Sequence, residues 1–410
     1  MIIKICYNII AYLTLLYSLY FAVTAIIGLI KKNKNSITKS SKKNYFAILI
    51  PARNEENVIG NLLDSLKELN YPKSKYSIHV IPNNCTDNTA NIIKNYDVNT
   101  MECHNEVKTK ADVLRYAFSN LKNDNHIDAY IIFDADNVVH PEFLTNMNNC
   151  LHNGSKVAQG YRDAKNPSDT WISGSYTLFY MLQNTFFNYS RMNLNSSSTL
   201  NGTGLMIKKS FIDETGFNTK SLTEDLEFTG ICALKNEKIA YVPDAITYDE
   251  YPNRFTSSWS QRKRWTSGIV ECTKLYFIKL LKNFFKTGNL SSLDLSLIYI
   301  SPAIQVLSFI NFIIILCVKI IEGNLNSLNN KFLITTIITT IISYIAIIII
   351  ELFTIYMKGK KPRKLLSGII FFPLFIATWI PINIMCFIKK ETKWKVINHD
   401  RNIKINDILK

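Results

Sequence analysis

The chain has 410 residues, of which 47% are hydrophobic, and carries a formal net charge of +15 at pH 7. This length accommodates one large domain or two modest ones. The positive charge does not indicate a nucleic-acid partner, because no nucleic-acid motif accompanies it and the lysines cluster beside apolar segments. Such clusters are typical of the cytosolic ends of membrane helices and favour contact with membrane lipid. The eight cysteines show no C-x-x-C pair and no zinc-ligand spacing, so we expect reduced thiols.

Long apolar runs with almost no charge predict membrane helices at both ends of the chain. They occupy residues 5–30, 292–321, 332–357 and 365–388. Each run can cross about 30 Å of hydrocarbon as a helix. Only Lys4 precedes the first run and no small-residue cleavage site follows it, so we interpret residues 1–32 as an uncleaved anchor rather than a signal peptide.

Between the apolar runs, residues 44–270 have the mixed polarity of a soluble α/β domain. Apolar runs that end at polar or proline residues predict three strands, Tyr45–Pro51, Ser77–Pro82 and Ala129–Phe133. Helical periodicity predicts three helices, Glu55–Leu69, Thr86–Tyr96 and Lys110–Leu121. Such alternation indicates a parallel sheet with crossover helices, in which ligands bind at the carboxyl ends of the strands.

Polar residues follow the first two predicted strands. The first strand ends in Pro51-Ala-Arg-Asn-Glu-Glu56, a turn that presents backbone N–H groups, with Arg53 or Glu55, to a ligand. The alternative is a plain helix start capped by Asn54. After the second strand, Asp87 either complements a helix dipole or contacts a nucleotide base or ribose.

Two acidic motifs lie further along the chain. Asp134 and Asp136 come directly after the third strand, where two carboxylates can hold one hard divalent ion and leave positions for phosphate oxygens. In Thr223-Glu-Asp225, the structural interpretation is a helix capped by Thr223 with acids in its first turn. The functional interpretation makes Asp225 a general base.

A fifth motif, Gln261-Arg-Lys-Arg-Trp265, precedes the last three apolar runs. Residues 271–290 then predict an amphipathic helix, with lysines on one face of 274–286 and apolar residues on the other. This pattern favours a helix lying in the membrane interface, although a buried helix of the soluble domain is the alternative.

Membrane helices are expected between residues 291 and 390, followed by a basic tail at 391–410. Polar residues at helical spacing in the first of these runs predict the lining of a conduit: Ser301, Gln305, Ser308 and Asn311. The side of the membrane on which the tail lies stays open, because Pro373 and Pro381 interrupt the last run and allow it to be broken or re-entrant.

The five motifs resemble those of the membrane-embedded family 2 glycosyltransferases, the group that includes cellulose, hyaluronan and poly-N-acetylglucosamine synthases. PARNEE, NNCTDNT, DAD, TED and QRKRW occur in the family's order and at roughly its spacings over residues 45–270. The resemblance implies a GT-A type, Rossmann-like α/β domain in the cytosol, flanked by transmembrane helices of a multi-pass cell-membrane protein. It also implies sugar transfer from a UDP-sugar.

The resemblance further implies roles for individual residues. Asp134 and Asp136 fit the D-x-D pair that holds Mg²⁺ or Mn²⁺, and Asp225 fits the catalytic base. The residues expected to clamp the diphosphate and line the acceptor end are Glu224, Gln261, Arg264 and Trp265. Those expected to contact the nucleotide-sugar are Pro51, Arg53, Glu55, Asp87, Lys110 and Asp134. Asn83 stands where many family members have an acid, and Ala111 stands where a glycine usually follows the lysine. Both departures affect the expected contacts with the nucleotide.

We therefore predict an inverting, metal-dependent transferase that uses UDP-glucose, UDP-N-acetylglucosamine or a related donor. The expected acceptor is a growing polysaccharide, elongated processively and exported across the membrane. Transfer of one sugar to a membrane lipid is the first alternative, and the Q-x-x-R-W motif favours the polymerising members over it. A non-catalytic channel or scaffold is the second, and the intact Asp134, Asp136 and Asp225 argue against it.

Overall fold

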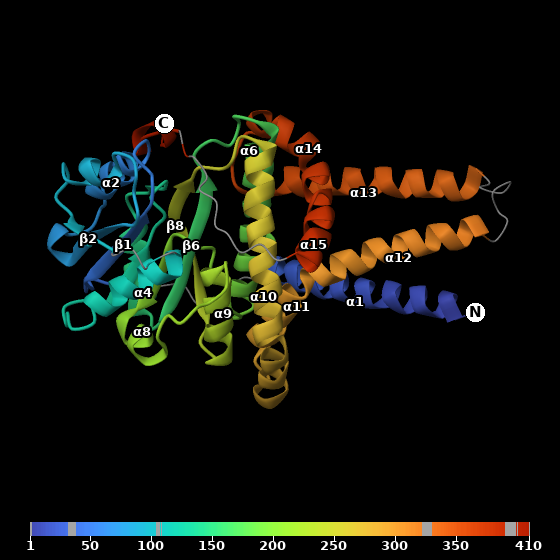
Figure 1. Ribbon diagram of the computed structural model, residues 1–410, viewed down its shortest axis with the longest axis horizontal. Helices are drawn as coiled ribbons and strands as arrows, with labels where there is room; N and C mark the ends of the chain where they lie inside the picture. The colour runs from blue at the N-terminus through green and yellow to red at the C-terminus, as the bar shows by residue number, and fades with distance from the viewer. Residues whose placement is uncertain are drawn as a thin grey trace.

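The computed structural model describes residues 2–31, 38–103, 107, 109–321, 330–389, 399 and 401–409. Its centre is a mixed sheet with helices on both faces, and long apolar helices project together from one side of this domain (Figure 1). This arrangement confirms the predicted GT-A type α/β fold.

The described sheet has eight strands in the order β3-β2-β1-β4-β7-β6-β8-β5. In chain order they are β1 (Phe46–Ala52), β2 (Tyr76–Pro82), β3 (Asn99–Thr100), β4 (Ala129–Ile132), β5 (Val138–Val139), β6 (Val157–Ala164), β7 (Leu205–Lys208) and β8 (Ile239–Asp249). The three predicted strands are the parallel β2, β1 and β4. Beyond β4 the sheet is mixed, because β7 pairs antiparallel with both β4 and β6.

Helices cover both faces of the sheet and bury two apolar cores. One face carries α2 (Ile59–Lys67), α3 (Thr89–Ile93) and α5 (Phe143–His152), and the other carries α4 (Lys110–Asn120), α8 (Lys209–Thr215) and α9 (Glu224–Leu234). A short 3₁₀ turn, η1 (Lys73–Lys75), precedes β2. Because β1 and β4 contact both cores, their side chains are buried on both sides, which explains their continuous apolar sequence.

The predicted helices at 55–69 and 86–96 are shorter in the structure, because their first turns form a cross-linked pair of loops. Asn54 does not cap α2. Its backbone has φ 57°, and its side-chain oxygen accepts a hydrogen bond from Thr86 N at 2.8 Å. Glu55 N donates to Thr89 Oγ1 at 2.8 Å, which ties the loop after β1 to the loop after β2.

Apart from the short helix α16 (Ile405–Ile408) near the C-terminus, the remaining described helices lie on the apolar side of the molecule. They are α1 (Ile2–Ile30), α6 (Trp171–Leu182), the π-helix η2 (Gln183–Tyr189), α7 (Ser190–Asn193), α10 (Phe255–Thr287), α11 (Leu290–Tyr299), α12 (Ser301–Ile321), α13 (Asn330–Met357), the 3₁₀ turn η3 (Pro362–Leu365), α14 (Leu366–Ala377) and α15 (Trp379–Ile388). The residues predicted as a separate amphipathic helix, 271–290, mostly belong to α10. No proline interrupts this helix, and Gly288, with a φ of 69°, ends it.

Four helical stretches in the described part are long and apolar enough to cross a membrane: Ile2–Ile30, Ser301–Val318, Ile334–Met357 and Pro362–Ile388. The first three project from the same side of the domain, where α1 packs on α12. By contrast, α14 and α15 run across them and pack along α6 and α10 (Figure 1). The last apolar run is therefore broken, between Ala377 and Trp379, rather than one straight helix.

A buried ion pair fastens α1 to the domain. Arg191 on α7 donates to Asp294 on α11 through Nη2 at 2.8 Å, and the two side chains are 1% and 7% exposed. Tyr20 of α1 donates to the same carboxylate at 2.8 Å. Gly28 lies so close to Ser190 that an added Cβ would be 2.5 Å from the serine backbone oxygen.

The basic segment after α13 also contacts the domain. Lys360 Nζ lies 2.5 and 2.6 Å from the two carboxylate oxygens of Asp163 on β6. Lys358 lies 4.8 Å from the ring centre of Tyr161 on the same strand. Two of the lysines predicted to mark membrane topology therefore also dock the membrane helices onto the sheet.

We expect Arg191→Met to lower the free energy of unfolding by about 3–5 kcal/mol, because it leaves Asp294 buried without its cation. The double variant Arg191→Met, Asp294→Leu should recover most of this loss. Thermal unfolding of the detergent-solubilised chain measures both, with the exposed pair Lys67–Asp64 as a control whose disruption changes little. Equal losses in the single and double variants would contradict the coupling.

Candidate active site

A cavity of about 730 Å³ lies at the carboxyl ends of β1 and β4, between the sheet and α6, α9 and α10. Eleven of the twelve residues predicted from the motifs line it: Pro51, Arg53, Glu55, Lys110, Asp134, Asp136, Glu224, Asp225, Gln261, Arg264 and Trp265. Residues more than 200 positions apart in the sequence therefore meet in one space.

Asp87 is the predicted residue that does not line this cavity. Its carboxylate accepts hydrogen bonds from Thr89 N at 3.1 Å and Glu56 N at 3.1 Å. Because these local donors occupy both oxygens, Asp87 stabilises the paired loops after β1 and β2. Asp87 thus stabilises the turn that carries Arg53 and Glu55.

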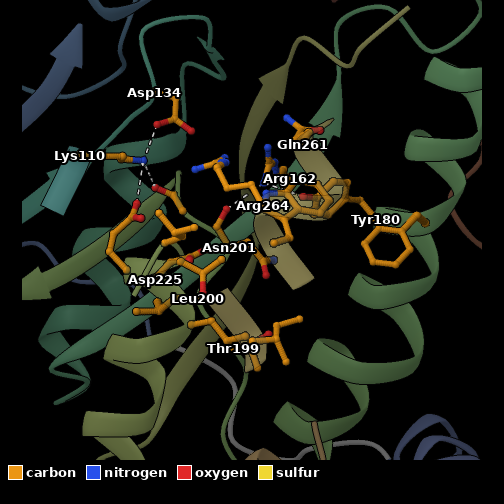
Figure 2. Close-up of a pocket in the computed structure, with 18 of the residues that line it drawn as sticks. Lys110, Asp134, Arg162, Tyr180, Thr199, Leu200, Asn201, Asp225, Gln261 and Arg264 are labelled. Carbon is orange, nitrogen blue, oxygen red and sulfur yellow. Dashed lines mark hydrogen bonds and ion pairs between the residues drawn. The ribbon is translucent and has the colours of Figure 1, made fainter. Parts of the chain in front are cut away.

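Lys110 is the cation at the centre of the site (Figure 2). It is the first residue of α4, whose start is fixed by a capping box between Thr109 and Asp112. Its ammonium group pairs with Asp134, donates to Gly202 O at 2.7 Å and lies 3.7 Å from Glu224 Oε1. Burial opposes its charge, but Asp134 and then Glu224 offset burial and raise the pKa of Lys110 above its ordinary value.

The two acids after β4 have different surroundings. Asp134 faces Lys110, and although burial opposes its charge, this cation lowers the pKa of the carboxyl below its usual range. The Asp134 backbone N–H donates to Thr203 Oγ1 at 3.0 Å, which fixes the end of the strand. Asp136 instead faces His399, with 3.7 Å between its Oδ2 and Nε2.

These residues fit a hard divalent ion. Their oxygen atoms are the ligands that Mg²⁺ and Mn²⁺ prefer, and such ions are commonly held by one or two carboxylates plus substrate phosphates. The described residues contain no ready-made group of three ligating side chains, so a bound ion would need oxygens from its nucleotide.

Asp225 lies in the first turn of α9, beside a turn rich in glycine. Burial, followed by the negative charge of Glu224, raises the pKa of Asp225 to about 6. The structural interpretation holds only in part: Thr223 precedes the helix without a capping hydrogen bond from its side chain, whereas the acids do lie in the first turn. A Cβ on Gly202 would lie 3.3 Å from Asp225 Oδ2, so the glycine allows the loop to approach the carboxylate.

The fifth motif lies on α10, and its side chains occupy two opposite faces of this helix. Gln261, Arg264 and Trp265 line the cavity. Arg262 is buried on the other side of the helix, where its Nη1 donates to Phe375 O at 3.0 Å and Thr378 Oγ1 at 2.7 Å. Arg264 contributes positive charge near Asp134 and Asp225.

Sequence reasoning missed Arg162, a second buried cation of the site (Figure 2). It pairs with Asp249 at the end of β8 and donates through Nη1 to Tyr180 OH at 2.8 Å and Asn201 O at 2.9 Å. The available signal was the pair of charges Arg162 and Asp163 inside an otherwise buried strand. Asp249 itself has a pKa raised to about 7, because burial outweighs the effect of Arg162.

Aromatic side chains connect the charged end of the cavity to the membrane helices. Tyr180 stacks on Tyr251 with ring centres 5.4 Å apart, and Trp265 lies edge-on to Tyr180 at 6.4 Å. Beyond them Phe179 stacks on Trp379 of α15 at 5.3 Å. The cavity reaches the predicted conduit residues Ser301 and Gln305, whereas Ser308 is exposed on α12 and Asn311 is outside the lining.

The described part of the tail lies on the α/β domain. The Arg401 backbone N–H donates to Glu250 Oε2 at 3.0 Å, and its guanidinium lies 2.7 Å from Asp169 Oδ2. Ile405, in the short helix α16 (Ile405–Ile408), is buried against Val138 and Tyr248. The described part of the tail therefore packs on the same domain that contains the sheet.

Comparisons with known proteins agree with this architecture. The family described as Glycosyltransferase like family 2 matches residues 43–268, more than half of the chain. A poly-beta-1,6-N-acetyl-D-glucosamine synthase of Staphylococcus epidermidis is 25% identical over 323 residues, which cover 76% of this chain and 74% of that protein. A beta-monoglucosyldiacylglycerol synthase of Nostoc is 26% identical over 250 residues, covering 58% of this chain and 52% of that protein.

The chain thus spans about half the length of the second of these relatives. Among solved structures, the mannosyltransferase PcManGT from Pyrobaculum calidifontis, determined with GDP-Man and Mn²⁺, superposes with a TM-score of 0.60. The superposition covers 88% of this chain and 98% of that one at 16% identity, so the likeness concerns the fold.

We expect Gly204→Ala to lower both thermal stability and activity. Gly204 has φ +61°, and an added Cβ would lie 2.9 Å from Thr247 Oγ1, so the change combines backbone strain of about 1–3 kcal/mol with a steric clash that displaces the Asn201–Gly204 turn. Gly359→Ala is the matched control, because Gly359 has φ +63° with nothing within 4 Å. If both variants lost the same stability, the contact with Thr247 would have no role.

Proposed function

The chain belongs to glycosyltransferase-like family 2, and we propose that it transfers a sugar from a UDP-sugar to an acceptor hydroxyl at the membrane surface, with inversion at the anomeric carbon. One observation carries this proposal: a single cavity contains the acid pair after β4, the carboxylate of Asp225 and the cavity face of the α10 motif. Each part meets one requirement of the reaction.

The donor's diphosphate needs neutralising charge as it leaves. Asp134 and Asp136 are the residues that would hold Mg²⁺ or Mn²⁺, and that ion would supply positive charge to the diphosphate. Arg264 adds a guanidinium, which suits phosphate oxygens because it can donate two parallel hydrogen bonds. Lys110 keeps Asp134 ionised and oriented beside this position.

Asp225 is proposed as the general base. It takes the proton of the acceptor hydroxyl while that oxygen bonds to the anomeric carbon and the bond from this carbon to the diphosphate oxygen breaks, its electron pair leaving with the diphosphate. One base opposite the leaving group gives a single displacement and therefore inversion. A pKa of about 6 leaves Asp225 ionised at neutral pH and basic enough to accept the proton.

The proposed acceptor is a growing saccharide. The aromatic side chains of Tyr180, Trp265 and Trp379 line the route from Asp225 toward the membrane helices, and flat rings of this kind suit the apolar faces of sugar rings. Processive elongation and export are parts of this proposal that rest on the Q-x-x-R-W motif and on Ser301 and Gln305 at the membrane end.

A membrane lipid is the second candidate acceptor, and a specific observation favours it. The membrane end of the cavity is lined mainly by apolar side chains: Leu182, Phe187, Ile269, Ile298, Phe372 and Ile376. Such a lining suits an amphiphile whose hydroxyl reaches Asp225 while its chains stay toward the bilayer. The lipid-glucosylating activity in the name of the Nostoc relative agrees with this candidate.

For the membrane arrangement, we propose that the α/β domain and the C-terminal tail both lie in the cytosol. In this topology α1, α12 and α13 cross the bilayer of the cell membrane, while α14 and α15 lie along its cytosolic face. Lys358 and Lys360, which contact β6, agree with this orientation because lysines concentrate at cytosolic helix ends.

UDP release by isolated membranes, given each of several UDP-sugars with Mg²⁺ or Mn²⁺, tests the reaction. We expect release with one donor, and a loss of about 10²–10⁴-fold in Asp225→Asn because the general base is removed. Asp64→Asn, an exposed carboxylate on α2, is the control that retains release. A large saccharide product supports the polymer, a single lipid-mobile product supports the lipid acceptor, and no release with any donor contradicts the proposal.

The acid limb of the pH profile tests the base separately. With a pKa of about 6, Asp225 should become protonated below this pH, so kcat/KM should fall about tenfold per pH unit there and level off above it. Glu224→Gln removes the neighbouring charge that raises this pKa and should therefore move the limb to lower pH. A limb that stays in place in Glu224→Gln would assign it to another group.

A further inference from the structure

Arg162 is a largely buried cation of the cavity that belongs neither to the α10 motif nor to the acidic motifs (Figure 2). Its side chain is 13% exposed and lies on β6. A guanidinium is not deprotonated in proteins, and a buried charge is costly unless it is paired. A permanent charge kept in the wall of a ligand cavity is therefore a candidate for binding an anionic ligand.

The protein itself uses three N–H groups of this guanidinium. Nε donates to Asp249 at the end of β8, and Nη1 donates to Tyr180 OH at 2.8 Å and to Asn201 O at 2.9 Å. Cζ also lies over the Tyr180 ring, 4.4 Å from its centre. Because these contacts come from β8, α6 and the glycine turn, they hold the guanidinium in one orientation.

Nη2 is the nitrogen that these contacts leave available. It has no hydrogen-bond partner within the described part of the chain, and it is not among the polar atoms that are buried without a partner. Its two N–H groups are therefore accessible from the cavity that Arg162 lines. Lys110 differs, because its ammonium group donates to Gly202 O and pairs with Asp134.

The glycine turn places Arg162 beside the acid pair after β4. Two consecutive carbonyl groups of this turn accept from the two cations: Asn201 O from Arg162 and Gly202 O from Lys110. Since Lys110 also pairs with Asp134, the guanidinium lies next to the acid that is expected to accompany the diphosphate.

The charges acting on the acids agree with this placement. Burial raises the pKa of Asp134, and Lys110, then Arg162 and then Arg264 lower it. Burial also raises the pKa of Asp225, where the opposing cations are Lys110 and Arg264. Because Coulomb interactions weaken with distance, Arg162 belongs to the donor side of the cavity rather than to the side of the proposed base.

We propose that Nη2 of Arg162 binds the sugar-bearing phosphate of the donor's diphosphate and stabilises the charge on this group as it leaves. This inference rests on the proposed function, because the diphosphate is that of the proposed donor. Arg162 lies between Asp134 and the aromatic Tyr180, which is where the bond from the diphosphate to the sugar would break. A donor that is already oriented needs no rearrangement when negative charge develops.

Two other roles are open to this side chain, and they predict different losses. A purely structural Arg162 would only balance Asp249, and an acceptor-binding Arg162 would donate to a hydroxyl of the acceptor. UMP lacks the terminal phosphate of UDP, and this phosphate carries the sugar in the donor. The ratio of the Kd values of UMP and UDP therefore reports contacts with that phosphate alone.

The experiment measures both Kd values with Mg²⁺, by titration calorimetry of the full-length chain in detergent. We expect the wild type to bind UDP more tightly than UMP. Arg162→Gln should weaken UDP binding about tenfold or more, the usual worth of a hydrogen bond to a charged group, while the Kd of UMP stays close to its wild-type value. Arg115→Gln is the matched control, because Arg115 pairs with Asp112 and lies outside the cavity lining.

Two further variants separate phosphate binding from folding. Arg162→Gln leaves Asp249 buried without its cation, which can destabilise the site. The double variant Arg162→Gln, Asp249→Asn removes both charges, so it should fold and bind UMP but still lose the preference for UDP. Asp249→Asn alone keeps an oxygen acceptor for Nε and should retain this preference. Circular dichroism identifies any variant that has failed to fold.

A Kd ratio that stays at the wild-type value in the folded Arg162 variants would overturn the proposal, as would a wild type that binds UDP no more tightly than UMP. The outcome is independent of the transfer assay. A UDP preference that depends on Arg162, without UDP release from any donor, would leave the phosphate contact standing and the proposed reaction failing. UDP release with a preference that does not depend on Arg162 would do the reverse.

Discussion

Carboxylates crowded into one buried cavity are the constraint on which this structure depends. Burial disfavours the charged form of a carboxyl group, and neighbouring negative charges add to this effect. Both causes, burial first, raise the pKa values of Glu55, Asp225 and Asp249. Asp134 differs because the first residue of α4 supplies Lys110 to it, which lowers its pKa. Three features place cations beside these acids. The capping box fixes the start of α4, the glycine turn accepts a hydrogen bond from Lys110, and the end of β6 carries the charged Arg162.

The helix α10 connects the cavity to the apolar helices α14 and α15, because it packs against both. Its cavity side carries Arg264, while Arg262 on the opposite side is fully buried with its guanidinium 4.3 Å from the ring centre of Phe375 and 4.9 Å from that of Trp379. These rings belong to the break between α14 and α15. One turn further along, Thr266 donates to Asn383 on α15 at 3.2 Å. A shift of α14 and α15 would therefore move the motif helix, so the position of the cavity wall is tied to these two helices.

The sequence predicted what local patterns encode. The three parallel strands, the GT-A type fold and the family are confirmed, because apolar runs and turn motifs are read along the chain. What it missed depends on contacts between distant segments. Arg162 has no motif, and its partners Tyr180, Asn201 and Asp249 lie 18, 39 and 87 residues away in the sequence. The placement of the tail was open, because hydropathy cannot show that α14 and α15 turn across the other helices or that Ile405 packs against Val138 of β5.

The polarity of the cavity changes along its length, and in the proposed reaction this gradient gives the sugar donor and the acceptor separate approaches. Charged groups gather where β1 and β4 end, aromatic rings follow at Tyr180 and Trp265, and apolar side chains of α11 and α14 close the membrane end. A nucleotide diphosphate fits only the charged region, because in the aromatic and apolar regions its negative charge would be buried without counter-ions. The acceptor, whether a saccharide or a membrane lipid, would then enter from the membrane end of the cavity. Asp225 lies between the two regions, where a base must be if donor and acceptor meet from opposite directions.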